Sequence, residues 1–311
     1  MLCDLAHSFP SKVAELLERD RGLKRNFREE SVTDLLMFSL VGLEPFGVRV
    51  DFPDEPTTGG DMDWIFTAPR DIGGGRYLRI ILQAKRAQFA KSKGGYWYYH
   101  HLDHEKGKQA QTLVSYAGGA PNGMSTLPLY IFYHPTSALS AKTATEPAVE
   151  GINLVFAHQI EPVVAGGCKR KHKTVNAWRS SFMQLSDILC WPFVPVPKPT
   201  SPAQASTLGL QITGGPSRVL PFAAGFHPDV VAARLRNRLE NVRAKGPIVD
   251  IGAHGISAID GIPADIERAI DGKMTLADRK ELARPRVIFS TTLTRNDPSF
   301  DREMQRAALK A

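Results

Sequence analysis

The stretch TTGGDMDWIFTAP, residues 57–69, contains an apolar run with the length and composition of a buried strand. The stretch RYLRIILQAKR, residues 76–86, has the same character. The loop between them contains three consecutive glycines, which permit the positive φ angles of a hairpin turn. We therefore expect the two strands to pair as an antiparallel hairpin.

Polar side chains lie at one end of both strands. On an extended chain side chains alternate, so Asp61 and Asp63 share one face, and Gln83 and Lys85 do the same. The hairpin would bring one of the aspartates together with Gln83 and Lys85 at one end of a sheet. Oxygen ligands of this kind hold Mg²⁺, or Mn²⁺ in its place, while leaving coordination positions for water and phosphate.

Such a cluster predicts hydrolysis of a phosphodiester. A bound ion would polarise the phosphate and lower the pKa of a water molecule. Lys85 would orient that water or stabilise the charge that develops on phosphorus. The glycine-bearing segments form neither a phosphate-binding loop nor a dinucleotide-binding unit, so the sequence does not indicate nucleotide hydrolysis.

Hydrophobic periodicity predicts an α/β fold around this hairpin. The expected helices cover residues 11–20, 28–43, 107–116, 229–245 and 263–271, and the further strands cover residues 127–135, 151–160 and 284–294. Residues 87–107 have no clean period and are predicted to form a surface loop. The tail after Asn296 is predicted to be a short, loosely held helix.

Proline content predicts how the chain is divided. The segment WPFVPVPKPT, residues 191–200, holds four prolines, and small residues follow it. We predict an α/β domain over residues 1–195, a proline-rich linker over residues 196–228 and a smaller C-terminal α/β region of unknown role over residues 229–311.

The motif order also resembles a known group. GDMDWIF followed by ILQAKRA, after a helix that bears EESVTD, resembles the PD-(D/E)xK superfamily of restriction-endonuclease-like nucleases. The likeness is nearest to the Mrr-type branch, in which the last motif reads Gln-x-Lys. It covers roughly residues 25–160. It implies a restriction-endonuclease-like core, with a mixed central sheet flanked by helices, that cleaves nucleic acid with a divalent metal.

The resemblance also implies roles for individual residues. Its catalytic set consists of Glu30, Asp61, Gln83 and Lys85, and the metal would be held by Asp61, Glu30, Gln83 and the Ala84 carbonyl. Asp61 and Asp63 compete for the role of main ligand, because the Gly-Gly-Asp context favours the first and the strand that starts after Asp63 favours the second. Further candidates are Asp34, one turn after Glu30, and Gln109 or Gln111 on the helix after the lysine strand.

Two further segments are candidates for contact with nucleic acid. In YYHHLDH, residues 98–104, we expect Tyr98 and Tyr99 to stack on bases and the histidines, His104 among them, to donate to phosphates. Ordinary surface histidines are an equal alternative, and no zinc motif is present. The basic run CKRKHK, residues 168–173, offers Lys169, Arg170 and Lys171 to backbone phosphates, with a solvated loop as the default alternative, and Arg86 follows the site lysine.

Composition adds broad expectations. The formal net charge of +7 over 311 residues favours a polyanionic partner. Neither a membrane-spanning apolar run nor a secretory leader is evident, so we predict a cytoplasmic protein without a membrane partner. Cys3, Cys168 and Cys190 are an odd number at wide spacing, which predicts free thiols in a reducing compartment.

Taken together, the sequence predicts a magnesium-dependent endodeoxyribonuclease. By analogy with the superfamily, defence against foreign DNA is an expected role. Two alternatives stay open: a non-catalytic nucleic-acid-binding protein on the same fold, and an RNase. The expected partner is a DNA substrate, and assembly into a homo-oligomer is left open.

Overall fold

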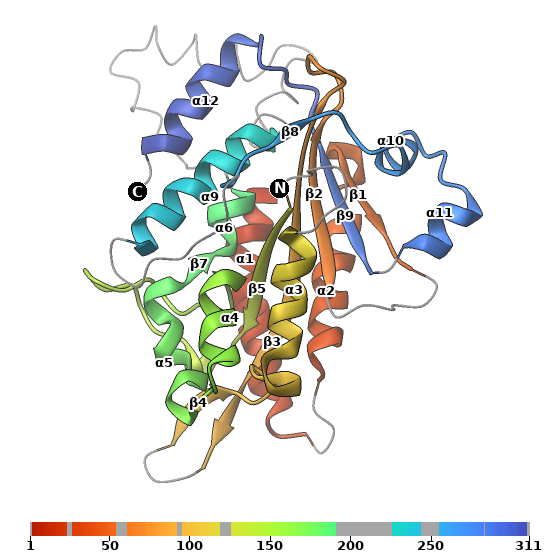
Figure 1. Ribbon diagram of the computed structural model, residues 1–311. Helices are drawn as coiled ribbons and strands as arrows, with labels where there is room; N and C mark the ends of the chain where they lie inside the picture. Colours follow the sequence, from red (N-terminus) through yellow and green to blue (C-terminus); the bar gives the residue numbers. More distant parts are fainter. Residues whose placement is uncertain are drawn as a thin grey trace, which may run out of the picture.

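The computed structural model describes residues 2–23, 27–53, 61–91, 95–118, 126–190, 226–243, 255–282 and 284–309 (Figure 1). These residues form an α/β fold around one nine-stranded sheet. The main strand order is β1-β9-β2-β3-β5-β6-β7, and β4 and β8 also pair with β3. The predicted α/β class with a mixed central sheet flanked by helices is confirmed.

The strands are short except for β3. Their bounds are β1 Val48–Asp51, β2 Met62–Ala68, β3 Arg76–Ala90, β4 Tyr96–Tyr99, β5 Thr126–Tyr133, β6 Ile152–Phe156, β7 Met183–Gln184, β8 Ile259–Asp260 and β9 Arg286–Ser290. The β3–β5 and β2–β9 pairs are parallel, and the other strand pairs are antiparallel.

Along the chain, the helices precede, separate and follow these strands. The α-helices are α1 Leu2–Asp20, α2 Glu29–Val41, α3 Lys108–Gly118, α4 Ala157–Ala165, α5 Val175–Trp178, α6 Leu185–Leu189, α9 Pro228–Arg243, α10 Ala264–Ile270, α11 Leu276–Glu281 and α12 Pro298–Leu309. The short 3-10 helices include η2 His104–Gly107 and η5 Arg170–Lys173. No helix in the described part of the chain is long and apolar enough to cross a bilayer.

The β2–β3 hairpin forms as the sequence predicts. Its register runs from Met62 opposite Leu82 to Ala68 opposite Arg76. The loop that joins the strands needs its glycines, because Gly75 has a φ of 88°, a region that favours glycine. A Cβ atom there would lie 2.8 Å from Ile262 Cδ1 and 3.1 Å from the Ala68 carbonyl oxygen.

Helices cover both faces of the sheet, and each face has its own apolar core. On one face, α1, α2, α6 and α9 pack on sheet residues such as Trp64, Phe66 and Leu82. On the other, α3 and α4 pack on Ile81 and Phe132. In Figure 1, α3 and α4 lie in front of the sheet, with α1 and α2 behind it.

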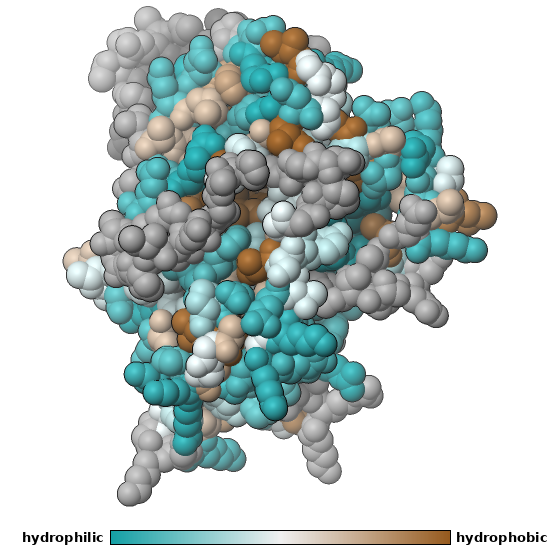
Figure 2. Space-filling model, viewed as in Figure 1, coloured by the Kyte–Doolittle hydropathy of each residue, from teal (hydrophilic) through white to brown (hydrophobic). Residues whose placement is uncertain are grey.

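The predicted surface loop over residues 87–107 is wrong in its first half. β3 continues to Ala90, and β4 returns antiparallel to it, with Ala87 opposite Tyr99 and Ala90 opposite Tyr96. The aromatic residues of β4 have high strand propensity. The many polar and charged residues around them left the segment without a clear hydrophobic period, so the strand was not predicted. Figure 2 shows mainly hydrophilic residues around the lower end of the molecule, where β4 and α5 lie in Figure 1.

Residues on both sides of the predicted domain boundary form the same sheet. β9, from the predicted C-terminal region, lies between β1 and β2. Most of the predicted linker, residues 196–225, lies outside the described residues. The tail helix α12 packs on α9 through Phe300, Ala307 and Val230, so it is held by an apolar contact.

The loop glycine gives a direct test of the hairpin. Gly75→Ala should destabilise the protein by about 1–3 kcal/mol, because alanine at this positive φ is strained and its methyl group meets backbone. Gly42→Ala is the matched control, since Gly42 has a φ of −63° and a Cβ there meets nothing within 4 Å. It should be neutral or stabilise by up to about 1 kcal/mol. Urea denaturation measures both, and equal effects would contradict the proposed role of the turn.

Candidate functional site

Asp61 is held against β3 by three hydrogen bonds, of which its side chain accepts two and its main chain donates one. Its main-chain N–H donates to the Leu82 carbonyl oxygen at 2.9 Å, which continues the β2–β3 pairing by one residue. Its Oδ2 accepts from Gln83 Nε2 at 2.6 Å and from the main-chain N–H of Ala84. The carboxylate is therefore fixed over the strand that carries Gln83 and Lys85.

The surroundings of Asp61 disfavour its negative charge. Burial raises the pKa of Asp61 to about 7, and the negative charges of Glu29 and Glu30 add to the shift. The Ala84 N–H and the Lys85 ammonium oppose the rise. Three carboxylates near one another in a partly desolvated position form a cluster that a cation would stabilise.

Lys85 lies between helix α2 and helix α3. Its side chain is 4% exposed, and its Nζ lies 3.8 Å from Glu29 Oε2. Nζ also donates to Gln109 Oε1 at 3.1 Å. Of the two glutamines that the sequence left open, Gln109 reaches the lysine, while Gln111 is exposed. The lysine is therefore ordered by one anion and one neutral acceptor.

An unusual turn positions Gln109. Glu105 and Lys106 have positive φ angles of 51° and 58°, which are uncommon for residues other than glycine, and Gly107 follows at 87°. A Cβ at Gly107 would lie 2.9 Å from the backbone of Val164 in α4. This left-handed segment packs closely on α4 and directs the start of α3 toward Lys85.

The acid of α2 that makes the direct contacts is Glu29. Its Oε1 accepts from the Arg86 main-chain N–H at 3.0 Å, and its Oε2 faces Lys85. Glu30, the residue chosen from the sequence, is exposed. Burial is the main cause that raises the pKa values of Asp61 and Asp34, and the negative charge of Glu30 raises both further. Both glutamates occupy the first turn of α2, so only the orientation of the helix distinguishes them.

Asp63 has a different role from Asp61. It is 3% exposed, and it forms ion pairs with Arg79 and Arg284, the latter at 3.5 Å. Two guanidinium groups therefore neutralise Asp63, which lies on β2 opposite Ile81, four residues before Lys85 on β3. Of the two aspartates that the sequence left open, Asp61 is the one in contact with Gln83.

Gln83 offers a candidate metal ligand. Its side chain is 2% exposed, and while Nε2 donates to Asp61, its Oε1 has no hydrogen-bond partner among the described residues. A buried acceptor without a donor costs free energy. A cation next to Asp61 would supply the missing partner, so the donor set of Asp61, Gln83 and the acidic start of α2 fits a hard divalent ion.

The other residues predicted to contact nucleic acid fall into two groups: some are buried or paired within the fold, and the rest are accessible. Tyr99 is fully buried, with its hydroxyl 2.6 Å from His134 Nε2, so the prediction that it stacks on bases is wrong. Arg86 forms an ion pair with Asp20 at 2.6 Å, which ties β3 to the end of α1. Tyr98 is only partly buried. The more accessible members are His104, Lys169, Arg170 and Lys171.

Among the residues that the structure describes, two other groups of side chains have the composition of metal ligands. One joins His227 to Asp71 and Asp229, with His227 Nε2 at 3.0 Å from Asp71 Oδ2. Its carboxylates also pair with arginines, Asp71 with Arg295 at 3.1 Å and Asp229 with Arg76. These ion pairs give the group a structural role, tying the β2–β3 loop to α9 and to the chain after β9.

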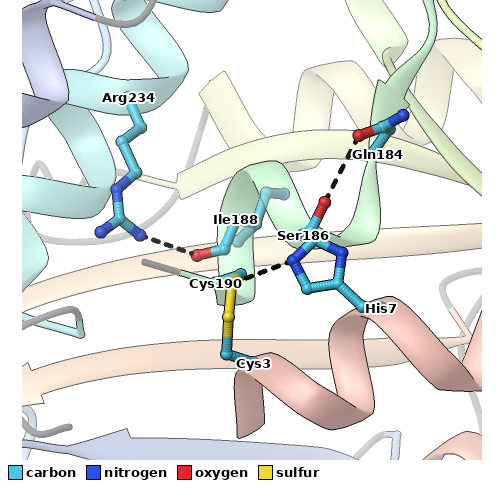
Figure 3. Close-up of a disulfide and its surroundings, with 7 residues drawn as sticks. All are labelled: Cys3, His7, Gln184, Ser186, Ile188, Cys190 and Arg234. Atoms are coloured by element: carbon cyan, nitrogen blue, oxygen red, sulfur yellow. Dashed lines mark hydrogen bonds between the residues drawn. A yellow bond between two sulfur atoms is a disulfide. The ribbon is translucent and has the colours of Figure 1, made fainter. Parts of the chain in front are cut away.

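The second group contains a disulfide. Cys3 in α1 is bonded to Cys190, directly after α6, and His7 Nε2 lies 3.3 Å from Cys190 Sγ (Figure 3). The prediction of free thiols is therefore wrong for these two cysteines, and Cys168 is the free one. The bond links positions 187 residues apart, a proximity that only the tertiary structure creates.

Comparison with known proteins places the chain in a family without assigning it a function. Residues 2–297 match a family of unknown function, DUF6615, and the chain belongs to that family. No curated protein and no solved structure matches it. The matched region includes β9 as well as β1 to β7, in agreement with their membership of one sheet.

The raised pKa of Asp61 predicts how stability depends on pH in protein treated with a chelator. The unfolded carboxyl ionises near pH 4 and the folded one near pH 7, so the wild type should lose stability relative to Asp61→Asn as pH rises between these values. Each unit of pKa difference corresponds to about 1.4 kcal/mol. Above about pH 8, where the folded carboxyl is also ionised, the difference should become constant. Urea denaturation at intervals from pH 4 to pH 8 measures it.

Asp63→Asn is the matched control for this experiment. It should destabilise the protein at every pH in the series, by about 3–5 kcal/mol, because it leaves the buried Arg284 and the partly buried Arg79 without their anion. If Asp61→Asn behaved in the same way, Asp61 would be an ordinary structural ion-pair partner.

Proposed function

We propose that this member of the DUF6615 family is a metal-dependent nuclease that hydrolyses phosphodiester bonds in DNA. The observation that carries the proposal is that Asp61, directly before β2, meets Gln83 and Lys85 of β3 and the acidic start of α2. These elements are distant in sequence, and what they bring together is an oxygen donor set beside a buried ammonium group.

The ligands for the ion would be Asp61, Gln83, the Ala84 carbonyl and a glutamate of α2. Mg²⁺ or Mn²⁺ bound there would polarise a phosphate and lower the pKa of a water molecule. Asp61 is preorganised for this role, because the Ala84 N–H and Gln83 Nε2 fix one of its oxygens. Glu29 supports the proposal more directly than Glu30, since it already contacts the lysine.

Lys85 would act on the phosphate itself. Its ammonium group is nearly buried, so its interaction with a developing negative charge would be stronger than in water. Gln109 and Glu29 hold Nζ in place, and neither neutralises it fully: one is uncharged and the other lies 3.8 Å away. The group can therefore donate a hydrogen bond to a phosphoryl oxygen or position the attacking water.

Gln83 favours one alternative function. An amide in this place gives the site one negative charge fewer than a second carboxylate would. A non-catalytic nucleic-acid-binding protein could keep the same fold with such a weakened site. This alternative predicts binding that needs no metal and that survives loss of Lys85.

A cleavage assay tests the proposal. Plasmid and linear duplex DNA, single-stranded DNA and RNA are incubated with the purified protein in Mg²⁺, Mn²⁺ or EDTA. We expect metal-dependent cutting of DNA that falls roughly 100-fold or more in Asp61→Asn and in Lys85→Met, because each removes a group that acts on the reacting phosphate. Lys142→Met, at an exposed lysine, is the matched control and should cut at the wild-type rate.

A second readout separates metal binding from catalysis. Mn²⁺ should raise the melting temperature of the wild type and of Lys85→Met but not that of Asp61→Asn. Cutting by both site variants at the wild-type rate would exclude this site. Nucleic-acid binding without cutting under every metal condition would instead favour the non-catalytic alternative, and preferential cutting of RNA would identify an RNase.

A further inference from the structure

A continuous row of aromatic rings extends from the β3–β4 hairpin toward the candidate site. The ring centroids of Tyr96 and Tyr98 lie 5.8 Å apart, and those of Tyr98 and His100 lie 6.0 Å apart. His100 and His101 follow at 4.4 Å, and His101 and His104 at 5.9 Å. We refer to these five residues as the aromatic row.

The row is accessible because of the alternation along β4. Tyr96 and Tyr98 lie on one face of the strand, while Trp97 and Tyr99 lie on the other. Tyr99 is buried with its hydroxyl 2.6 Å from His134 Nε2, and Trp97 Nε1 donates to the Ser137 carbonyl oxygen at 3.1 Å, so these two hold the hairpin to the protein. The rings of the row are partly or fully exposed.

Positive charge gathers at the outer end of the row. The bridge between Tyr98 and Thr174 joins β4 to the chain directly after η5. The Arg170 guanidinium lies 4.9 Å from the centroid of the Tyr96 ring. Lys169 and Lys171 are exposed on the same segment. Aromatic faces and cations are therefore adjacent, a combination that suits bases together with phosphates.

The inner end of the row reaches the candidate site. Burial lowers the pKa of His101 and the neighbouring His100 lowers it further, while Glu29 and Lys85 also act on it with opposite signs. Glu29 and Lys85 are two of the residues that line the site, so His101 lies close enough for the charge of each to act on it. His104 follows on η2, immediately before α3, which carries Gln109.

We propose that the aromatic row is a binding track for single-stranded nucleic acid that leads the strand to Lys85. The inference rests on the proposed nuclease function and narrows its substrate to unpaired strands. Side-chain rings stack on bases only where the bases are unpaired, because in a duplex each base is already stacked between its neighbours. The exposed lysines of η5 and its flank would contact the backbone phosphates.

A binding experiment in EDTA tests this track independently of catalysis. Fluorescence anisotropy is measured with labelled oligonucleotides as single-stranded DNA, single-stranded RNA and duplex DNA. The wild type should bind at least one single strand more tightly than the duplex, and the double variant Tyr96→Ala, Tyr98→Ala should bind it roughly tenfold or more weakly. Phenylalanine at both positions should restore binding, because the ring face remains.

Two controls isolate stacking from other effects. Phe38→Ala removes an aromatic ring that is 74% exposed on α2, outside the row, and should leave binding unchanged. Replacing Lys169 and Lys171 with glutamine should reduce the slope of log affinity against log salt by about 0.7 for each phosphate that a lysine no longer neutralises. Melting temperatures show whether each variant is folded.

The outcomes separate the track from the nuclease. If the tyrosine variant loses single-strand binding while the wild type cuts nothing, the track stands and the proposed catalysis fails. If the wild type cuts duplex DNA and the tyrosine variant cuts and binds as well as the wild type, the nuclease stands and the track is overturned. Duplex binding that equals or exceeds single-strand binding in the wild type also overturns it.

Discussion

The position of Asp61 depends on the register of β3. This strand pairs with β2 along one edge and with β5 along the other, and its far end carries β4. A shift of one residue would turn Gln83 and Lys85 to the opposite face of the sheet, away from α3 and Asp61. Pairing on both edges makes such a shift costly, because it would also move Ile81 out of one core and Leu82 out of the other.

Charge is distributed unevenly along this hairpin. Asp63 is neutralised by two arginines, and Asp20 pairs with Arg86, so these buried carboxylates have fixed partners. Asp61 has hydrogen-bond donors and one ammonium group nearby, but also two glutamates. The structure thus distinguishes acids that stabilise the fold from one whose charge the fold disfavours. A residue of the second kind is a candidate for function, because its ionised form does not stabilise the fold.

The C-terminal part of the chain completes the fold. β9 lies between β1 and β2, and Arg284, just before it, reaches Asp63. Farther on, Arg295 pairs with Asp71 at the β2–β3 loop. The site hairpin is therefore supported on its outer side by residues more than 200 positions away in sequence.

The local features of the site could be predicted from the sequence. Apolar runs and glycines determine the β2–β3 hairpin, and alternation along an extended chain places Gln83 and Lys85 on one face. Helical periodicity also places an acidic turn at the start of α2 and a glutamine on α3. These features depend on neighbours within a few residues, so the pattern of residue types is enough to predict them.

Only the tertiary structure decided which of the similar residues meet. The orientation of α2 brings Glu29 rather than Glu30 to Lys85, and ion pairs from Arg79 and Arg284 assign Asp63 to the fold. The same holds for the place of β9 in the sheet and for the Cys3–Cys190 disulfide. Each of these contacts joins segments that are far apart along the chain, and their proximity is set by the packing of whole helices and strands, which no local pattern encodes.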